Sequence, residues 1–271
     1  MTGIIAGTYG ITQPKGGILR AEFFDPVPVS LAYDRVLSKE NLPGDIVGGA
    51  VKILSCLEAM ARDTGFDVDS SVLLERAERA VFENDHSRIA ESASAEVFAK
   101  GLTARVTGFD MAAADCACKL SFCMLGPNGR SVGPSRIRAD DRTCNNILTM
   151  ADRMTSFLDV MGPVRRICFR FTGGYGKAVN EGYGLFLTDR CLWDVTVSPD
   201  PLPEDARLRL LVRYVLCRGS ADPALRSVEN IGIMNPRLNC AYMMSASAIP
   251  SDVLTYAAEG IAGIDDSRAS D

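Results

Sequence analysis

The sequence predicts a protein of mixed α and β structure (α/β, of the α+β kind), with a mainly helical N-terminal region and a sheet between helices in the C-terminal half. Three observations predict this class. Of the 271 residues, 47% are hydrophobic and 23% are charged, proportions typical of a globular chain and not of a disordered one. Apolar residues recur at helical spacing in much of the first half. In the second half, short β-rich segments alternate with turn residues.

The expected helices of the N-terminal region, residues 1–130, follow from apolar spacing. Asn41 can open a first helix over 43–60. Further helices are predicted over 70–81 and 87–98. Residues 101–125 are compatible with a helix and with a strand, so their state remains open at the level of sequence.

The C-terminal region is predicted to form a compact core over 131–264, followed by a disordered tail over 265–271. Asp140 or Asp141 is expected to cap its first helix, and Gly162 ends that helix. The predicted elements are a helix over 141–161, strands over 164–171, 183–187 and 191–197, a helix around 208–216, a hairpin of 231–234 with 241–244, and a last helix from about 250.

The charge pattern allows a nucleic-acid partner without requiring one. The net charge is −5, and an overall negative field opposes non-specific binding to phosphates. Residues 130–218 nevertheless carry 14 basic and 10 acidic side chains, and the basic ones are almost all arginine, which suits phosphate contacts. Arginines on ordinary solvated helix faces explain the same pattern.

Cysteine and histidine usage argues against disulfide and zinc chemistry. The nine cysteines are an odd number, and the N-terminus lacks the basic start of a secretory signal, so we expect a cytoplasmic protein without a disulfide framework. Cys116, Cys118 and Cys123 lack the paired spacing of a zinc site, and the single histidine, His86, lies in a polar stretch. No apolar run is long enough to span a membrane, so no membrane partner is expected.

The order helix, strand, strand, strand, helix, strand resembles the core of the PD-(D/E)xK, or restriction-endonuclease-like, nuclease superfamily. Segments 169–175, 184–188, 192–198 and 231–239 are similar to an uncharacterised bacterial branch of it, over roughly residues 135–255. The resemblance implies a mixed sheet flanked by helices and a site that cleaves phosphodiesters with divalent metal ions. Such a site needs converging carboxylates, because Mg²⁺ prefers oxygen ligands, and a lysine that stabilises developing charge.

At the positions that the resemblance assigns to this site, only one of five expected groups is present. Asp194 stands at the acidic position of the third strand. Thr172 and Leu185 replace acids, Thr196 replaces the lysine, and Arg209 replaces a glutamine. One carboxylate cannot by itself hold Mg²⁺ in a catalytic geometry, and a leucine beside a metal is unfavourable. A structural interpretation is that Asp194 pairs with Arg209 on the adjacent helix.

The sequence therefore favours a catalytically inactive nuclease-fold protein, a pseudo-nuclease, that acts by binding. The ligand is expected to be DNA or RNA, held by an arginine-rich surface, or a protein partner. No cofactor and no bound metal are expected under this interpretation. The candidate binding residues are Arg165, Arg166, Arg170, Arg207, Arg209 and Arg213.

Two alternatives remain open. The first is an active nuclease that depends on Mg²⁺ or Mn²⁺ and whose site has been rebuilt from neighbouring residues, with Asp194 acting beside Glu181, Asp189 or Lys177. Such relocation must overcome the alternation of side chains between the faces of a strand. It predicts that Asp194 lies within about 5 Å of Glu181 or Asp189, close enough to share one metal. The second is an unrelated enzyme or a structural component of an oligomer.

Overall fold

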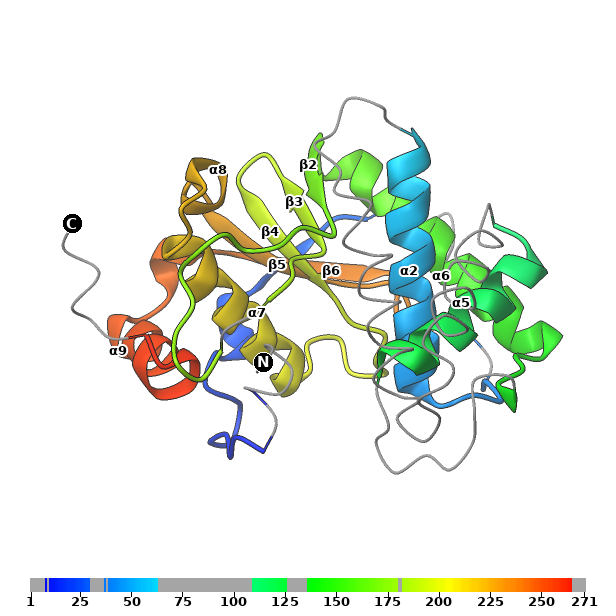
Figure 1. Ribbon diagram of the computed structural model, residues 1–271, viewed down its shortest axis with the longest axis horizontal. Coiled ribbons are helices and arrows are strands. Elements are labelled where there is room, and N and C mark those ends of the chain that lie inside the picture. Colours follow the sequence, from blue (N-terminus) through cyan, green and yellow to red (C-terminus); the bar gives the residue numbers. More distant parts are fainter. Residues whose placement is uncertain are drawn as a thin grey trace, which may run out of the picture. The chain divides into compact units, whose positions relative to one another are not determined.

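The structure, a computed structural model, contains two compact units (Figure 1). One unit is Ser30–Val160, and the other combines Met1–Val29 with Met161–Asp271. The first unit is thus inserted into the sequence of the second, whereas the sequence predicted a boundary near residue 130. The described residues are 8, 10–29, 37, 39–62, 109–125, 136–179 and 182–264.

The helices in the described part of the inserted unit are α2 (Gly44–Arg62), α5 (Met111–Met124) and α6 (Asp141–Val160), and each packs against the other two. They confirm the helices predicted over 43–60 and 141–161, and they resolve part of 101–125 as helix. The predicted helices over 70–81 and 87–98, His86 and the tail over 265–271 lie outside the described residues.

The N-terminus of α6 has the cap that the sequence predicts. The Asp140 carboxylate accepts a hydrogen bond from the backbone N–H of Thr143, 2.8 Å away. Hydrogen bonding to Thr143 holds the pKa of Asp140 below its ordinary value. The Thr143 hydroxyl in turn donates to the side chain of Asn41 at 2.7 Å, so the residues that precede α2 are tied to the start of α6.

The second unit is built on a six-stranded mixed sheet in the order β1-β6-β5-β4-β3-β2. Strands β2, β3 and β4 form an antiparallel meander, β5 runs parallel to β4, and β6 and β1 continue antiparallel. The predicted hairpin is confirmed as β5 and β6. The strands are β1 (Asp25–Val27), β2 (Val164–Ile167), β3 (Phe186–Thr188), β4 (Cys191–Val195), β5 (Asn230–Asn235) and β6 (Cys240–Ser245).

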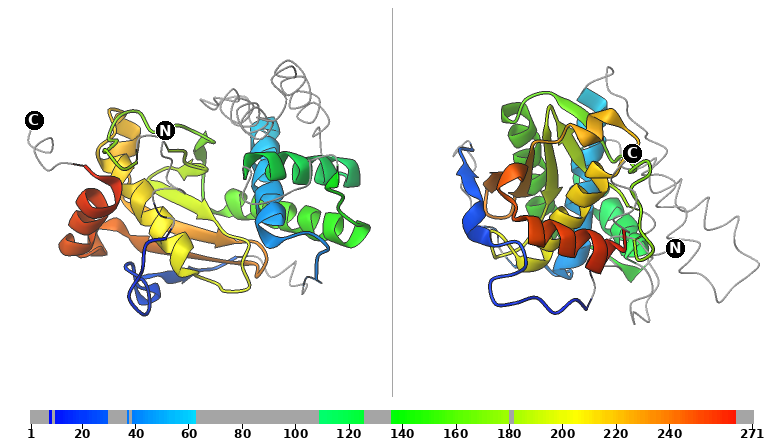
Figure 2. Two further views of the ribbon diagram at one scale, coloured as in Figure 1. Left: turned by 60° about the horizontal axis from the view of Figure 1, so that its bottom comes forward. Right: turned by 90° about the vertical axis from the view of Figure 1, so that its left-hand side faces the viewer.

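Helix α7 (Glu204–Arg218), followed by the short α8 (Pro223–Arg226), connects β4 to the parallel strand β5. Figure 2 shows α7 running across the sheet. Its apolar side chains form one core with Leu192 of β4 and Ile231 and Ile233 of β5. Leu19 and Phe24 from the N-terminal segment enter the same core. That segment is therefore an integral part of the sheet unit.

The last helix of the described residues is α9 (Ser251–Thr255), which continues as a π-helix, η6 (Tyr256–Ala262). Ala257, Ile261 and Ala262 bury one side of this helix in the core, and the loop at Lys177 hydrogen-bonds to its end through Gly263. Among the residues described above, no helix has both the length and the apolar character needed to cross a bilayer.

Close packing of α2 on α5 depends on Gly49. A Cβ at Gly49 would lie 2.0 Å from the hydroxyl oxygen and 2.9 Å from the Cβ of Ser121. We expect Gly49→Ala to lower the free energy of unfolding by about 1–3 kcal/mol, because overpacking outweighs the gain in helix propensity. Urea denaturation measures this change. Gly44→Ala is the matched control, since nothing lies within 4 Å of a Cβ there; equal stability of the two variants would contradict the prediction.

Candidate site around Asp194

Asp194 is the fourth residue of β4, and all five side chains of this strand are buried. Asp194 is 0% exposed. Because successive side chains of a strand point to opposite faces, Leu192 and Asp194 share one face and Trp193 lies on the other. Gly232 on β5 makes room for Trp193, since a Cβ there would lie 2.2 Å from the indole ring. The Asp194 carboxylate thus points toward α7, where its partners lie.

The closest partner of Asp194 is Arg213. The Nη1 atom of Arg213 lies 2.5 Å from Oδ2 of Asp194. The Nε–H of Arg213 donates to the carbonyl oxygen of Tyr183 at 2.9 Å, so one guanidinium joins β4 to the segment before β3. The other carboxylate oxygen, Oδ1, accepts a hydrogen bond from the backbone N–H of Val195 at 2.8 Å. The buried charge is therefore both paired and hydrogen-bonded.

Arg209 is a second, more distant partner. Its Nε lies 3.9 Å from Oδ2 of Asp194, while its Nη1 lies 2.5 Å from Oδ2 of the exposed Asp205. The sequence predicted the pair of Asp194 with Arg209, and the structure adds Arg213 as the nearer cation. Arg209 and Arg213 are four residues apart, the spacing that places two side chains on one helix face. This spacing is the sequence signal that could have identified Arg213.

The strand positions expected to supply a second acid and the lysine, Leu185 and Thr196, carry neither group. Extending the pairing of Phe186 with Trp193 by one residue places the buried Leu185 opposite Asp194. Thr196 is buried, and its backbone N–H donates to the carbonyl oxygen of Met234. This bond extends the pairing of β4 with β5 by one residue. The site thus presents one carboxylate and two guanidinium groups, an arrangement that suits an internal ion pair better than a divalent cation.

The residues proposed for a relocated site are not brought to Asp194 by the described part of the chain. Asp189 lies exposed in the turn between β3 and β4, where its Oδ1 accepts from Nε and Nη2 of Arg165 at 3.0 and 2.7 Å. Asp189 precedes β4, and Asp194 lies about 10 Å along the strand from the first residue of β4. Lys177 is exposed, and its backbone N–H donates to the carbonyl oxygen of Gly263. Glu181 lies outside the described residues.

Arg207 is buried and contacts backbone groups of its own unit, which indicates a structural role. It is 3% exposed, and its Nε donates to the carbonyl oxygen of Leu202 at 3.0 Å. Its Nη1 donates to the carbonyl oxygen of Gly16 at 2.9 Å and also to that of Leu19, so the guanidinium holds the N-terminal segment against α7. Burial lowers the pKa of Arg207. The backbone of Gly17 passes so close that a Cβ there would lie 3.1 Å from Nη1.

The six candidate arginines do not gather on one surface. Arg207 and Arg213 are buried, and Arg209 is largely so. The other three lie on β2 or shortly after it: Arg165 pairs with Asp189, Arg166 with Asp222 at 2.6 Å, and Arg170 stacks over the ring of Tyr183 at 5.6 Å. A ligand surface built from this set is therefore limited to Arg165, Arg166 and Arg170.

Several cysteines are buried and unreactive. Burial raises the pKa of the Cys118 thiol to about 12 and that of Cys144 to about 11. It also raises the pKa of Cys191 and Cys217. These four thiols stay protonated at neutral pH and are poor nucleophiles. Among the described residues, no three or more His, Cys, Asp or Glu side chains form a group that could hold a metal ion.

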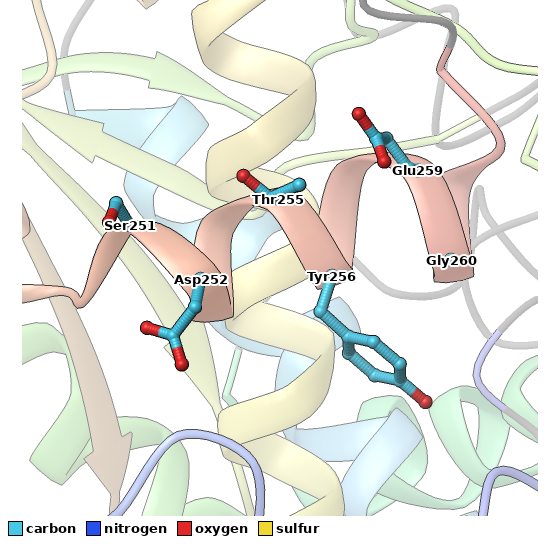
Figure 3. A pocket seen from close by; sticks show the side chains of 6 residues that line it. All are labelled: Ser251, Asp252, Thr255, Tyr256, Glu259 and Gly260. Carbon is cyan, nitrogen blue, oxygen red and sulfur yellow. The ribbon is translucent and has the colours of Figure 1, made fainter.

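Shallow depressions occur on the described surface of the sheet unit, and two of them are lined as follows. One is lined by the outer face of α9 and η6 (Figure 3), where Tyr256 is 49% exposed. Its lining residues are Ser251, Asp252, Thr255, Tyr256, Glu259 and Gly260. The other lies at the ends of the strands and includes the ion pairs of Arg165 with Asp189 and of Arg190 with Glu229. Neither includes Asp194.

Removing one member of the buried pair is expected to be costly. We predict that Asp194→Asn lowers the free energy of unfolding by about 3–5 kcal/mol, because Arg213 is left buried without its counter-charge. Urea denaturation measures the loss. The matched control is Asp189→Asn, which breaks an exposed ion pair with Arg165 and is expected to cost less than about 1 kcal/mol. Similar losses in both variants would contradict the prediction, as would additive effects of Asp194→Asn and Arg213→Met in a double-mutant cycle.

Loss of the Arg207 guanidinium is expected to release the N-terminal segment. Arg207→Met removes charged hydrogen bonds to three carbonyl groups, so we predict a loss of roughly 3 kcal/mol and faster tryptic cleavage after Lys15 and Arg20. Mass spectrometry of the early fragments gives the cleavage sites and rates. Arg190→Met, which removes an exposed partner of Glu229, should leave both quantities nearly unchanged. Unaltered cleavage in Arg207→Met would overturn this role.

No family model, no curated protein and no solved structure matches this chain. An assignment of function consequently depends on the residues around Asp194 and on the arrangement of the sheet. The chemical feature that distinguishes this region is a fully buried carboxylate paired with arginine from the helix that follows its own strand.

Proposed function

We propose that this protein is a catalytically inactive nuclease-fold protein that acts by binding. The observation that carries the proposal is the ion pair of Asp194 with Arg213, in which a guanidinium lies against the one carboxylate present at the expected acidic positions. The strand order supports the fold part of the proposal. An antiparallel meander followed by a helical crossover into a parallel strand agrees with the element order on which the resemblance rests.

Metal-dependent catalysis would require a divalent cation to compete with Arg213 for the Asp194 carboxylate. A divalent cation at this carboxylate would have to displace Arg213, which would leave a largely buried guanidinium without its partner. The apolar Leu185, opposite Asp194, supplies no second ligand. Mg²⁺ usually retains several waters and requires near-octahedral oxygen ligands, which this buried position does not offer.

The ligand of such a protein is proposed to be a nucleic acid or a protein partner. For a nucleic acid, the available cations of the candidate set are Arg165, Arg166 and Arg170 on and after β2. Their present partners, two carboxylates and an aromatic ring, are near the surface, so a phosphate could compete for them.

The absence of catalysis is tested with labelled single- and double-stranded DNA and RNA in Mg²⁺ and in Mn²⁺. We expect no cleavage above a protein-free control, and no rise in the melting temperature on adding Mn²⁺. Cleavage that requires metal, is lost in Asp194→Asn and persists in Glu229→Gln, which breaks the exposed ion pair with Arg190, would overturn the proposal in favour of the active nuclease. Circular dichroism of each variant first establishes that it is folded, so that a loss of cleavage is not a loss of structure.

Nucleic-acid binding is tested by fluorescence anisotropy with the same labelled strands at several salt concentrations. We expect Arg165→Ala combined with Arg170→Ala to weaken binding several-fold and to reduce its salt dependence, because phosphate contacts release counterions. The matched control is Arg190→Ala, another exposed arginine in an acidic pair. Equal weakening by the control would reject Arg165 and Arg170 as the specific contact surface. The absence of binding by the unmodified protein at low salt would reject nucleic acid as the ligand and favour a protein partner.

A further inference from the structure

We draw no further inference here: the strongest candidate, the exposed face of α9 and η6 on which Tyr256 lies between Asp252 and Glu259 (Figure 3), carries none because nothing in the structure shows what covers it.

Discussion

The buried ion pair of Asp194 and Arg213 joins the middle of the sheet to α7, the helix that covers it. The residues around this pair must supply hydrogen-bond partners for the two charged groups. An uncompensated charge inside a protein costs several kcal/mol. The Tyr183 carbonyl oxygen accepts from Nε of Arg213, and the Val195 N–H donates to Oδ1 of Asp194. Arg209 brings a second positive charge, and Asp205 balances it at the helix surface. The position and rotation of α7 on the sheet follow from these contacts together with apolar packing.

The positive surplus between residues 130 and 218 is explained in part by internal use of arginine. Arg213 is neutralised by a carboxylate, whereas Arg207 is surrounded by three backbone carbonyl groups. Both lie on α7, on faces that meet different parts of the unit. Arginine suits these positions because its planar group offers several donors in fixed directions. An arginine-rich composition can thus arise from the requirements of the fold, without a bound polyanion.

Local features of this fold could be predicted from the sequence, and most long-range ones could not. The β5–β6 hairpin and the Asp140 cap of α6 depend on residues close in sequence, where turn chemistry and periodicity are informative. The pairing of Asp194 with a helix arginine followed from element order, but the preference for Arg213 depends on strand register and side-chain reach. The pairing of β1 with β6 has no local signal. The α5 sequence, rich in Ala and Cys, has too weak a periodicity to separate helix from strand.

The pairing of β1 with β6 has a consequence for synthesis on the ribosome. Asp25 of β1 pairs with Met243 of β6, so the first strand of the sheet in the sequence cannot pair until the last strand has been synthesised. The inserted unit is continuous in sequence and can complete its own contacts while the sheet remains unfinished. During that interval Leu19 and Phe24 have no core to enter, which exposes apolar surface for as long as elongation lasts. The sheet unit, unlike the inserted unit, can therefore complete its fold only after β6 has been synthesised.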